Sequence, residues 1–331
     1  MAPPPPVCEP TAVAVLRRTL RRAPSDSRSQ SALHNRAKRI AGLFSTDLIN
    51  PMKLSLSSAA RSALGISGLC GTLLFATSAQ AAPSFGDLRL GSEMRGQAAV
   101  NALGSRMPTV ASQYGMSAER LRDILLKDTS SRLDARGRLF YVEAMPSGVE
   151  QAGTQSGPTV SEAAPYDLSQ TFLLQSKPGS ARVLYLDFNG HSTSGTAWNS
   201  GAAINAQAFD TDGSPGSFSA AEQEAIQKVW QRVAEDYAPF DVNVTTADPG
   251  VDAIRRTSST DTQYGSRVVI TRNTFYNCSC GGVAYVGTFN YTSSSTPDYY
   301  QPAWVFFDAL GNGFEKSVAE AASHEAGHNL A

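Results

Sequence analysis

The stretch that decides the fold is WVFFDALGNGFEKSVAEAASHEAGHNLA at residues 304–331. It opens with an apolar strand at 304–307. Ser317 followed by Glu320 forms a capping box, which predicts the start of a helix. That helix carries His324-Glu325-Ala326-Gly327-His328. Because residues four apart lie on one face of a helix, the two imidazoles are expected side by side.

Two imidazoles at this spacing are typical ligands of a zinc ion, so His324 and His328 are the expected metal ligands and Zn²⁺ the expected cofactor. Glu325 lies beside them and is expected to act as general base on a zinc-bound water. The pattern therefore predicts hydrolysis of a peptide bond. A catalytic zinc needs a third protein ligand. Neither His34 nor His191 is expected in that role, so the third ligand is expected beyond Ala331.

The sequence before this helix alternates strands with one further helix. Ser219 and Glu222 form a second capping box, and Ile226, Val229 and Val233 recur at helical spacing, which predicts a helix over 220–237. Apolar or alternating runs predict strands. These runs lie at 182–188, 242–246, 267–271 and 283–286. The fold class expected from this order is α/β (or α+β), with a mixed sheet, a backing helix and the motif helix.

The N-terminal part of the chain divides into segments of different composition. Residues 1–51 are rich in Pro and Arg and are interpreted as an upstream extension. Residues 52–81 have a basic start, an apolar stretch and a small-x-small cleavage site, which indicate a signal peptide and secretion. We assign 82–150 to a prosegment with a short helix and a strand at 139–142. A linker at 151–170 and a catalytic domain at 171–331 follow.

Composition excludes some function classes. Basic residues outnumber acids in the first segments, so the body of the chain is mildly acidic and nucleic acid is not an expected partner. No later stretch is expected to span a membrane. Cys278 and Cys280 would remain after export. A disulfide is their expected state, either with each other or with a partner beyond Ala331.

The motif resembles that of the metzincin metallopeptidases, HExxHxxGxxH, in their adamalysin/reprolysin-like, bacterial secreted form. The chain matches it from His324 to Leu330 and has Ala331 where the family has Gly. The run 281–287, GGVAYVG, resembles the family's edge strand above the cleft, which binds an extended substrate as an added strand. The resemblance implies an upper catalytic subdomain in this chain, with the lower subdomain missing. It also implies four substrate-binding residues, Gly282, Val283, Ala284 and Tyr285.

The expected function is a secreted zinc endopeptidase acting on protein or peptide substrates. The alternative is a catalytically inactive, peptidase-like binding or adhesion protein. The chain as given is expected to be inactive or nearly so. Many relatives are zymogens held latent by a prosegment cysteine, which the segment 82–150 lacks. Latency is therefore expected to use a carboxylate, with Asp128 and Asp134 available, or steric blockage. The run 210–214 resembles the start of a calcium loop, although a polar turn is the favoured interpretation.

Overall fold

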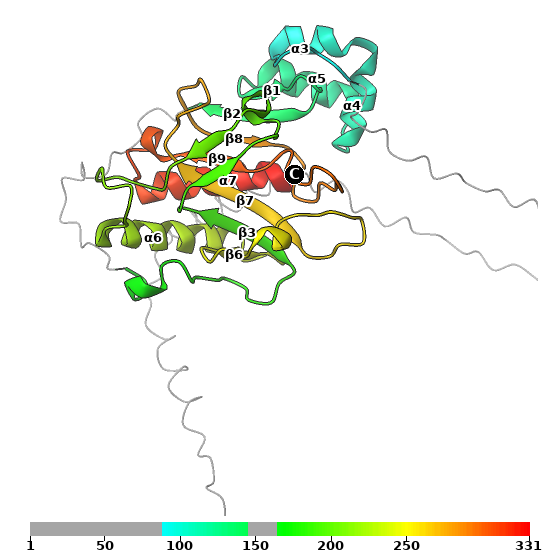
Figure 1. Ribbon diagram of the computed structural model, residues 1–331. Helices are drawn as coiled ribbons and strands as arrows, with labels where there is room; N and C mark the ends of the chain where they lie inside the picture. The colour runs from blue at the N-terminus through cyan, green and yellow to red at the C-terminus, as the bar shows by residue number, and fades with distance from the viewer. Residues whose placement is uncertain (1–87, 145–163) are drawn as a thin grey trace, which may run out of the picture. The chain divides into compact units, whose positions relative to one another are not determined.

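The computed structural model describes residues 88–144 and 164–331, which form a mixed α/β structure built on one large sheet (Figure 1). The sheet has seven strands in the order β1-β2-β8-β9-β7-β3-β6. The predicted extension at 1–51 and signal peptide at 52–81 lie outside the described residues, as does 145–163 between the two described parts.

The sheet is mixed, as predicted. β3 pairs in parallel with β6 and β7, and β7 pairs in parallel with β9, whereas β8 is antiparallel to both β9 and β2. β1 completes the order as an antiparallel neighbour of β2. The strands are β1 (Ser131–Leu133), β2 (Leu139–Ala144), β3 (Arg182–Asp187), β6 (Asn243–Thr245), β7 (Tyr264–Thr271), β8 (Cys280–Tyr285) and β9 (Ala303–Phe306).

Two strands begin earlier than predicted, because glycines that read as loop residues belong to them. β7 starts at Tyr264 and β8 at Cys280. A Cβ at Gly265 would collide with the backbone carbonyl of Val183, and a Cβ at Gly282 would lie 2.7 Å from Glu325 Cδ. The glycines therefore permit close approach within the sheet and between the sheet and a helix.

Two long helices pack on one face of the sheet. α6 (Ala220–Asp236) begins at the predicted capping box, in which Ser219 and Glu222 exchange hydrogen bonds. α7 (Glu315–Leu330) carries the motif but starts two residues before Ser317, so the predicted capping box there is wrong. The preceding turn explains the difference, because Phe314 already donates its N–H to Leu310 O and accepts from Val318 N.

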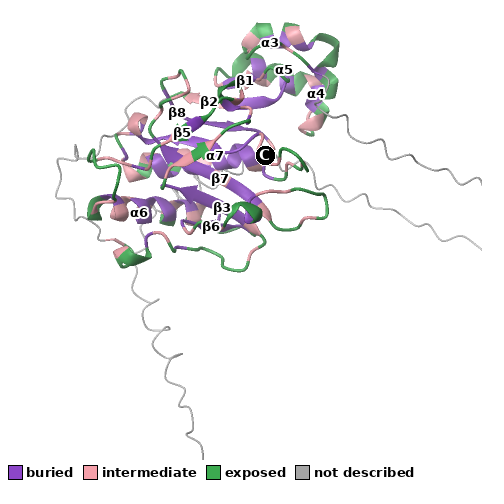
Figure 2. Cartoon of the chain, in the orientation of Figure 1, coloured by how far each residue is buried: buried purple, intermediate pink, exposed green. Residues whose placement is uncertain are grey.

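Side chains alternate across the sheet and divide the core in two. On the helix side, aliphatic residues of β3, β7 and β9 pack against α6 and α7. On the other side, Trp304, Phe306 and Tyr285 join an aromatic cluster with Trp198, beside the small hairpin β4 (His191–Thr193) and β5 (Ile204–Ala206). Figure 2 shows the central strands buried and the outer helix surfaces exposed. The period of two along each strand accounts for this division.

The N-terminal layer, which we define as residues 88–144, has a core of its own. Its helices are α3 (Gly96–Leu103), α4 (Met107–Gln113) and α5 (Ala118–Lys127), and the last begins at the predicted Ser117 cap. They gather beside β1 (Figure 1). Their buried apolar residues cluster with Leu133 and Leu139, and Val286 joins from outside the layer. The layer therefore packs mainly on itself, while β2 extends into the main sheet.

Candidate metal centre

Helix α7 brings the two predicted metal ligands together. His324 and His328 lie one turn apart, and their Nε2 atoms are 3.0 Å from each other. Ligand atoms bound tetrahedrally to one zinc at about 2.0–2.1 Å are separated by about 3.3 Å. The imidazole pair is therefore spaced as two ligands of a single ion.

A third ligand atom comes from Glu143 in β2, a residue that sequence reasoning missed. Its Oε1 lies 3.1 Å from His324 Nε2 and 3.3 Å from His328 Nε2. The three side chains form a group that could hold a metal ion. All three separations are close to the spacing that tetrahedral zinc requires. The residues present thus fit a metal ion bound by two imidazoles and one carboxylate.

The C-terminal end of α7 is held against the turn after β8. Gly287 N donates to His328 O at 2.9 Å, and Phe289 N donates to Asn329 O at 2.8 Å. Asn329 is buried, accepts from Ser266 and donates its amide to Tyr285 O at 2.9 Å. These bonds satisfy carbonyls that a helix end leaves unpaired. They also fix the position of His328 relative to β8.

Tyr141 positions His328 from the other side. The two rings are stacked with their centroids 4.2 Å apart and an interplanar angle of 3°. Tyr141 and Glu143 are two residues apart on β2, so both side chains point to the same face of the sheet. One strand thus contributes both the carboxylate and the ring that packs on the imidazole.

Glu325 is enclosed beside the imidazoles, next to Gly282. It is only 1% exposed, and neither carboxylate oxygen has a hydrogen-bond partner among the residues that the structure describes. A buried carboxylate without a partner is costly. Burial, and then the negative charge of Glu143, raise the pKa of Glu325 well above its usual range. A carboxyl with a raised pKa is suited to accept and return a proton.

The ligand side chains influence one another's ionisation. Burial lowers the pKa of His328, although its hydrogen bond with Glu143 opposes the shift. Burial would raise the pKa of Glu143, but hydrogen bonds from His324 and His328 outweigh it and lower that pKa. A neutral imidazole and an ionised carboxylate are the forms that bind a cation. The protein alone therefore favours the metal-binding protonation states of Glu143 and His328.

The predicted substrate-binding residues Gly282, Val283, Ala284 and Tyr285 all lie in β8, directly beside the metal centre. β8 is paired on both sides, with β9 on one and β2 on the other. The register with β2 places Glu143 opposite Gly282 and Tyr141 opposite Ala284. The side of β8 away from β9, where an added strand would pair, therefore carries β2.

A second group that could hold a metal ion consists of Asp210, Asp212 and Glu222. Asp210 Oδ1 accepts the N–H groups of Gly213 and Ser214. Glu222 Oε1 accepts from Thr211 N, and its Oε2 accepts from the helix cap. These bonds are those of a polar turn joined to a helix cap, which was the favoured interpretation of this run.

The remaining candidates lie away from the metal centre. His191 is in β4 and lines a cavity of about 180 Å³, with Arg267 and Asp298 in the same wall. Asp128 accepts from Ser130, and Asp134 accepts backbone N–H groups of its own turn and the Tyr285 hydroxyl. The hypothesis that one of these two aspartates occupies the metal centre is therefore wrong, and the carboxylate found there belongs to Glu143.

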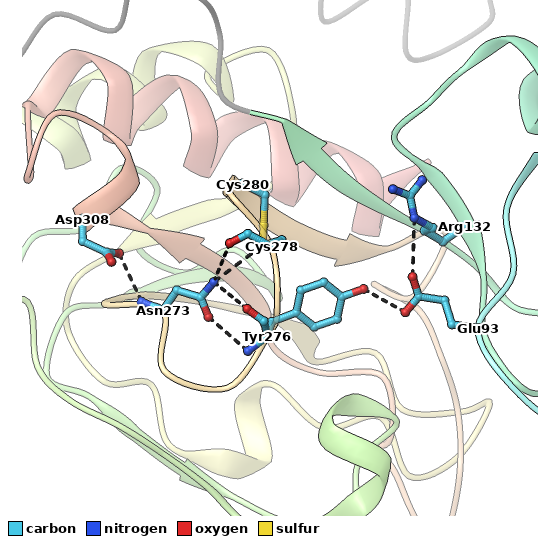
Figure 3. Close-up of a disulfide and its surroundings, with 7 residues drawn as sticks. All are labelled: Glu93, Arg132, Asn273, Tyr276, Cys278, Cys280 and Asp308. Carbon is cyan, nitrogen blue, oxygen red and sulfur yellow. Dashed lines mark hydrogen bonds and ion pairs between the residues drawn. A yellow bond between two sulfur atoms is a disulfide. The ribbon is translucent and has the colours of Figure 1, made fainter.

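Cys278 and Cys280 form a disulfide with each other at the start of β8. Figure 3 shows the surrounding loop, in which the Asn273 amide donates to Tyr276 O at 2.8 Å. The Tyr276 hydroxyl then donates to Glu93 of the N-terminal layer at 2.9 Å. The disulfide is thus part of a loop that contacts this layer, and neither cysteine belongs to the metal centre.

Comparison of the chain with known protein families, curated proteins and solved structures found no match. Across residues 88–144 and 164–331, none of the helices combines the length and the apolar character needed to cross a membrane. The metal centre is therefore the feature of the molecule that bears on its function.

Proposed function

We propose that the protein is a secreted zinc-dependent endopeptidase of metzincin-like type, with His324 and His328 as metal ligands and Glu325 as general base. The observation that carries the proposal is the arrangement on α7. Two Nε2 atoms lie 3.0 Å apart, and beside them lies a buried carboxylate that has no hydrogen-bond partner within residues 88–144 and 164–331. Burying a carboxylate without a partner costs stability, so a purely structural role of the His324–His328–Glu143 group does not account for Glu325.

The side chains have separate roles in the proposed reaction. A zinc ion held by the imidazoles would supply a Lewis acid and lower the pKa of water. Glu325 takes a proton from the attacking water and passes it to the leaving amine. Its enclosed position beside Gly282 keeps the carboxyl at a raised pKa, which suits both transfers.

β8 is the proposed binding strand for an extended peptide. Its residues 282–285 run beside the metal centre, and backbone groups of a substrate would pair with them as an added strand. Gly282 lies against Glu325, so a peptide paired along β8 passes close to the proposed base.

The proposal is tested by metal binding and peptide hydrolysis of the full-length protein. We expect one zinc per chain, with strong loss of binding in His324→Ala and His328→Ala. Glu325→Gln should retain zinc and lower hydrolysis of an internally quenched peptide by about 10²–10⁴-fold, since it removes the proton acceptor. Hydrolysis should also stop when a chelator removes the metal.

Glu320→Gln is the matched control, because Glu320 is exposed on the same helix. It should leave both zinc content and hydrolysis unchanged. Equal effects of Glu320→Gln and Glu325→Gln would contradict the proposed base. Zinc binding without hydrolysis by the full-length protein, also after Glu143→Gln, would favour the peptidase-like binding protein instead.

A further inference from the structure

The geometry points to an inbuilt inhibitor: β2 of the N-terminal layer occupies the place of a substrate strand on β8, and Glu143 occupies the metal centre. This inference rests on the proposed function, since it concerns access to the same site. It assigns to residues 88–144 the role of a competing ligand that must move before a peptide can bind.

β2 is paired with β8 along the residues that lie beside the metal centre. Residues 140–143 of β2 pair one to one with 285–282 of β8, in antiparallel register. Beyond this run, Val286 N donates to Leu139 O at 3.1 Å. These backbone groups of β8 are the ones that an added peptide strand would use. A peptide and β2 therefore cannot pair with the same side of β8 at once.

The side chains of β2 complete the occupation. Glu143 is opposite Gly282, and directly paired residues direct their side chains to the same face of a sheet. That face carries α7, so the carboxylate reaches His324 and His328 at 3.1 and 3.3 Å. Tyr141 covers the His328 ring from the same face. β2 thus occupies the backbone groups of β8, and its side chains contact the imidazoles of the metal centre.

Contacts outside β2 hold the N-terminal layer in place. Arg138 donates to Gly287 O at 3.0 Å, and its guanidinium lies over the Tyr300 ring at 4.6 Å. At the disulfide loop, Tyr276 donates to Glu93, which also pairs with Arg132 at 3.5 Å (Figure 3). The Tyr276–Glu93 contact is exposed, whereas Arg138 and Tyr300 are buried, so the contacts of Arg138 are the more costly to break.

The helices of the layer and β1 have an apolar cluster of their own, which Leu139 of β2 joins from within the layer and Val286 from outside it. Displacing β2 leaves most of that cluster intact. It also removes Phe140 and Val142 from the aromatic cluster beside Trp198 and Tyr285, in which both are buried. While the layer stays attached, the link within one chain gives Glu143 a high effective concentration at the imidazoles. Displacing β2 therefore costs buried apolar surface, which a bound peptide strand has to offset.

The test measures access to the centre in the full chain loaded with cobalt(II). The variant Glu143→Gln removes the anionic ligand and keeps the shape, and Glu143→Asp shortens it. Glu119→Gln, on the exposed surface of α5, is the control. We expect the cobalt absorption spectrum to change in Glu143→Gln and to remain that of the wild type in Glu119→Gln. A short peptide hydroxamate should bind Glu143→Gln about tenfold or more tightly than the wild type, with Glu143→Asp between them.

Hydrogen exchange gives a second readout that does not depend on the variants. Saturating the wild type with the peptide hydroxamate should increase exchange at residues 139–144, since the ligand displaces β2. Two results would overturn the inference: equal hydroxamate binding by wild type and Glu143→Gln, or undiminished protection of β2 in the complex. Failure of the proposed function looks different: cobalt binding would then not depend on His324 and His328, or the hydroxamate would bind none of the variants.

Discussion

Gly282 is the residue at which α7 comes closest to β8. A Cβ there would lie 2.7 Å from both Cγ and Cδ of Glu325, which is buried and cannot turn toward solvent. The absence of a side chain therefore lets the proposed base sit beside the strand that is proposed to bind substrate.

Replacing this glycine is expected to displace the helix. Gly282→Ala should lower the free energy of unfolding by about 1–3 kcal/mol, because an extra methyl group in a packed core forces a backbone shift. The measurement is urea unfolding followed by circular dichroism. Gly216→Ala is the control, since a Cβ at that position meets nothing within 4 Å. Equal stability of the two variants would contradict the described packing.

His191 links stability to pH. Burial, followed by the positive charge of Arg267, lowers the pKa of His191 from 6.5 to about 4. The unfolded chain then binds a proton at pH values where the folded chain does not. The stabilising contribution is complete above about pH 6.5 and is lost as the pH falls toward about 4.

A variant isolates this contribution. Comparing wild type with His191→Asn by urea unfolding at pH 7 and pH 4.5, we expect the wild type to lose ~1–2 kcal/mol more over that interval. The figure allows for partial exposure of the ring. An identical pH dependence in both proteins would show that His191 is solvated and titrates normally.

At the scale of elements, local signals and long-range pairing differ in what sequence can reveal. Ser219 and Glu222 predicted the start of α6, because a capping box is made by residues three apart. The same pattern at Ser317 failed, because the turn at 310–314 starts α7 earlier. A local motif predicts a helix start only where no neighbouring turn has already set the direction of the chain.

The α6 cap can be tested through Glu222. Its carboxylate accepts Thr211 N at 2.7 Å and Ser219 N at 2.8 Å while buried, so it joins a loop to the helix. Glu222→Ala should cost about 1–3 kcal/mol of stability, because two partly buried N–H groups lose their acceptor. Thermal or urea unfolding measures the loss.

Glu224 on the same helix is the control. It forms an i,i+4 ion pair with Lys228 at 3.1 Å, and such pairs contribute about 0.3–0.5 kcal/mol. If Glu224→Ala were as destabilising as Glu222→Ala, the cap would not be what stabilises the beginning of α6.

At the scale of the whole molecule, the mixed α/β class was predictable from alternating strands and helices, and so were His324 and His328. The pairing of β2 with β8 was not predictable. A strand was predicted at 139–142, but no local pattern indicates that it pairs with residues 280–285, far along the chain. Glu143 was missed for that reason. Its role depends on a sheet register, and a register is a property of the folded molecule.

The central claim is that His324 and His328 hold a zinc ion. Zinc K-edge X-ray absorption of the full chain, loaded with one equivalent of zinc, tests it most directly. We expect imidazole scattering, with nitrogen and oxygen neighbours at about 2.0–2.1 Å, that is lost in His324→Ala and His328→Ala. Sulfur neighbours at about 2.3 Å, or a spectrum unchanged by either substitution, would contradict it.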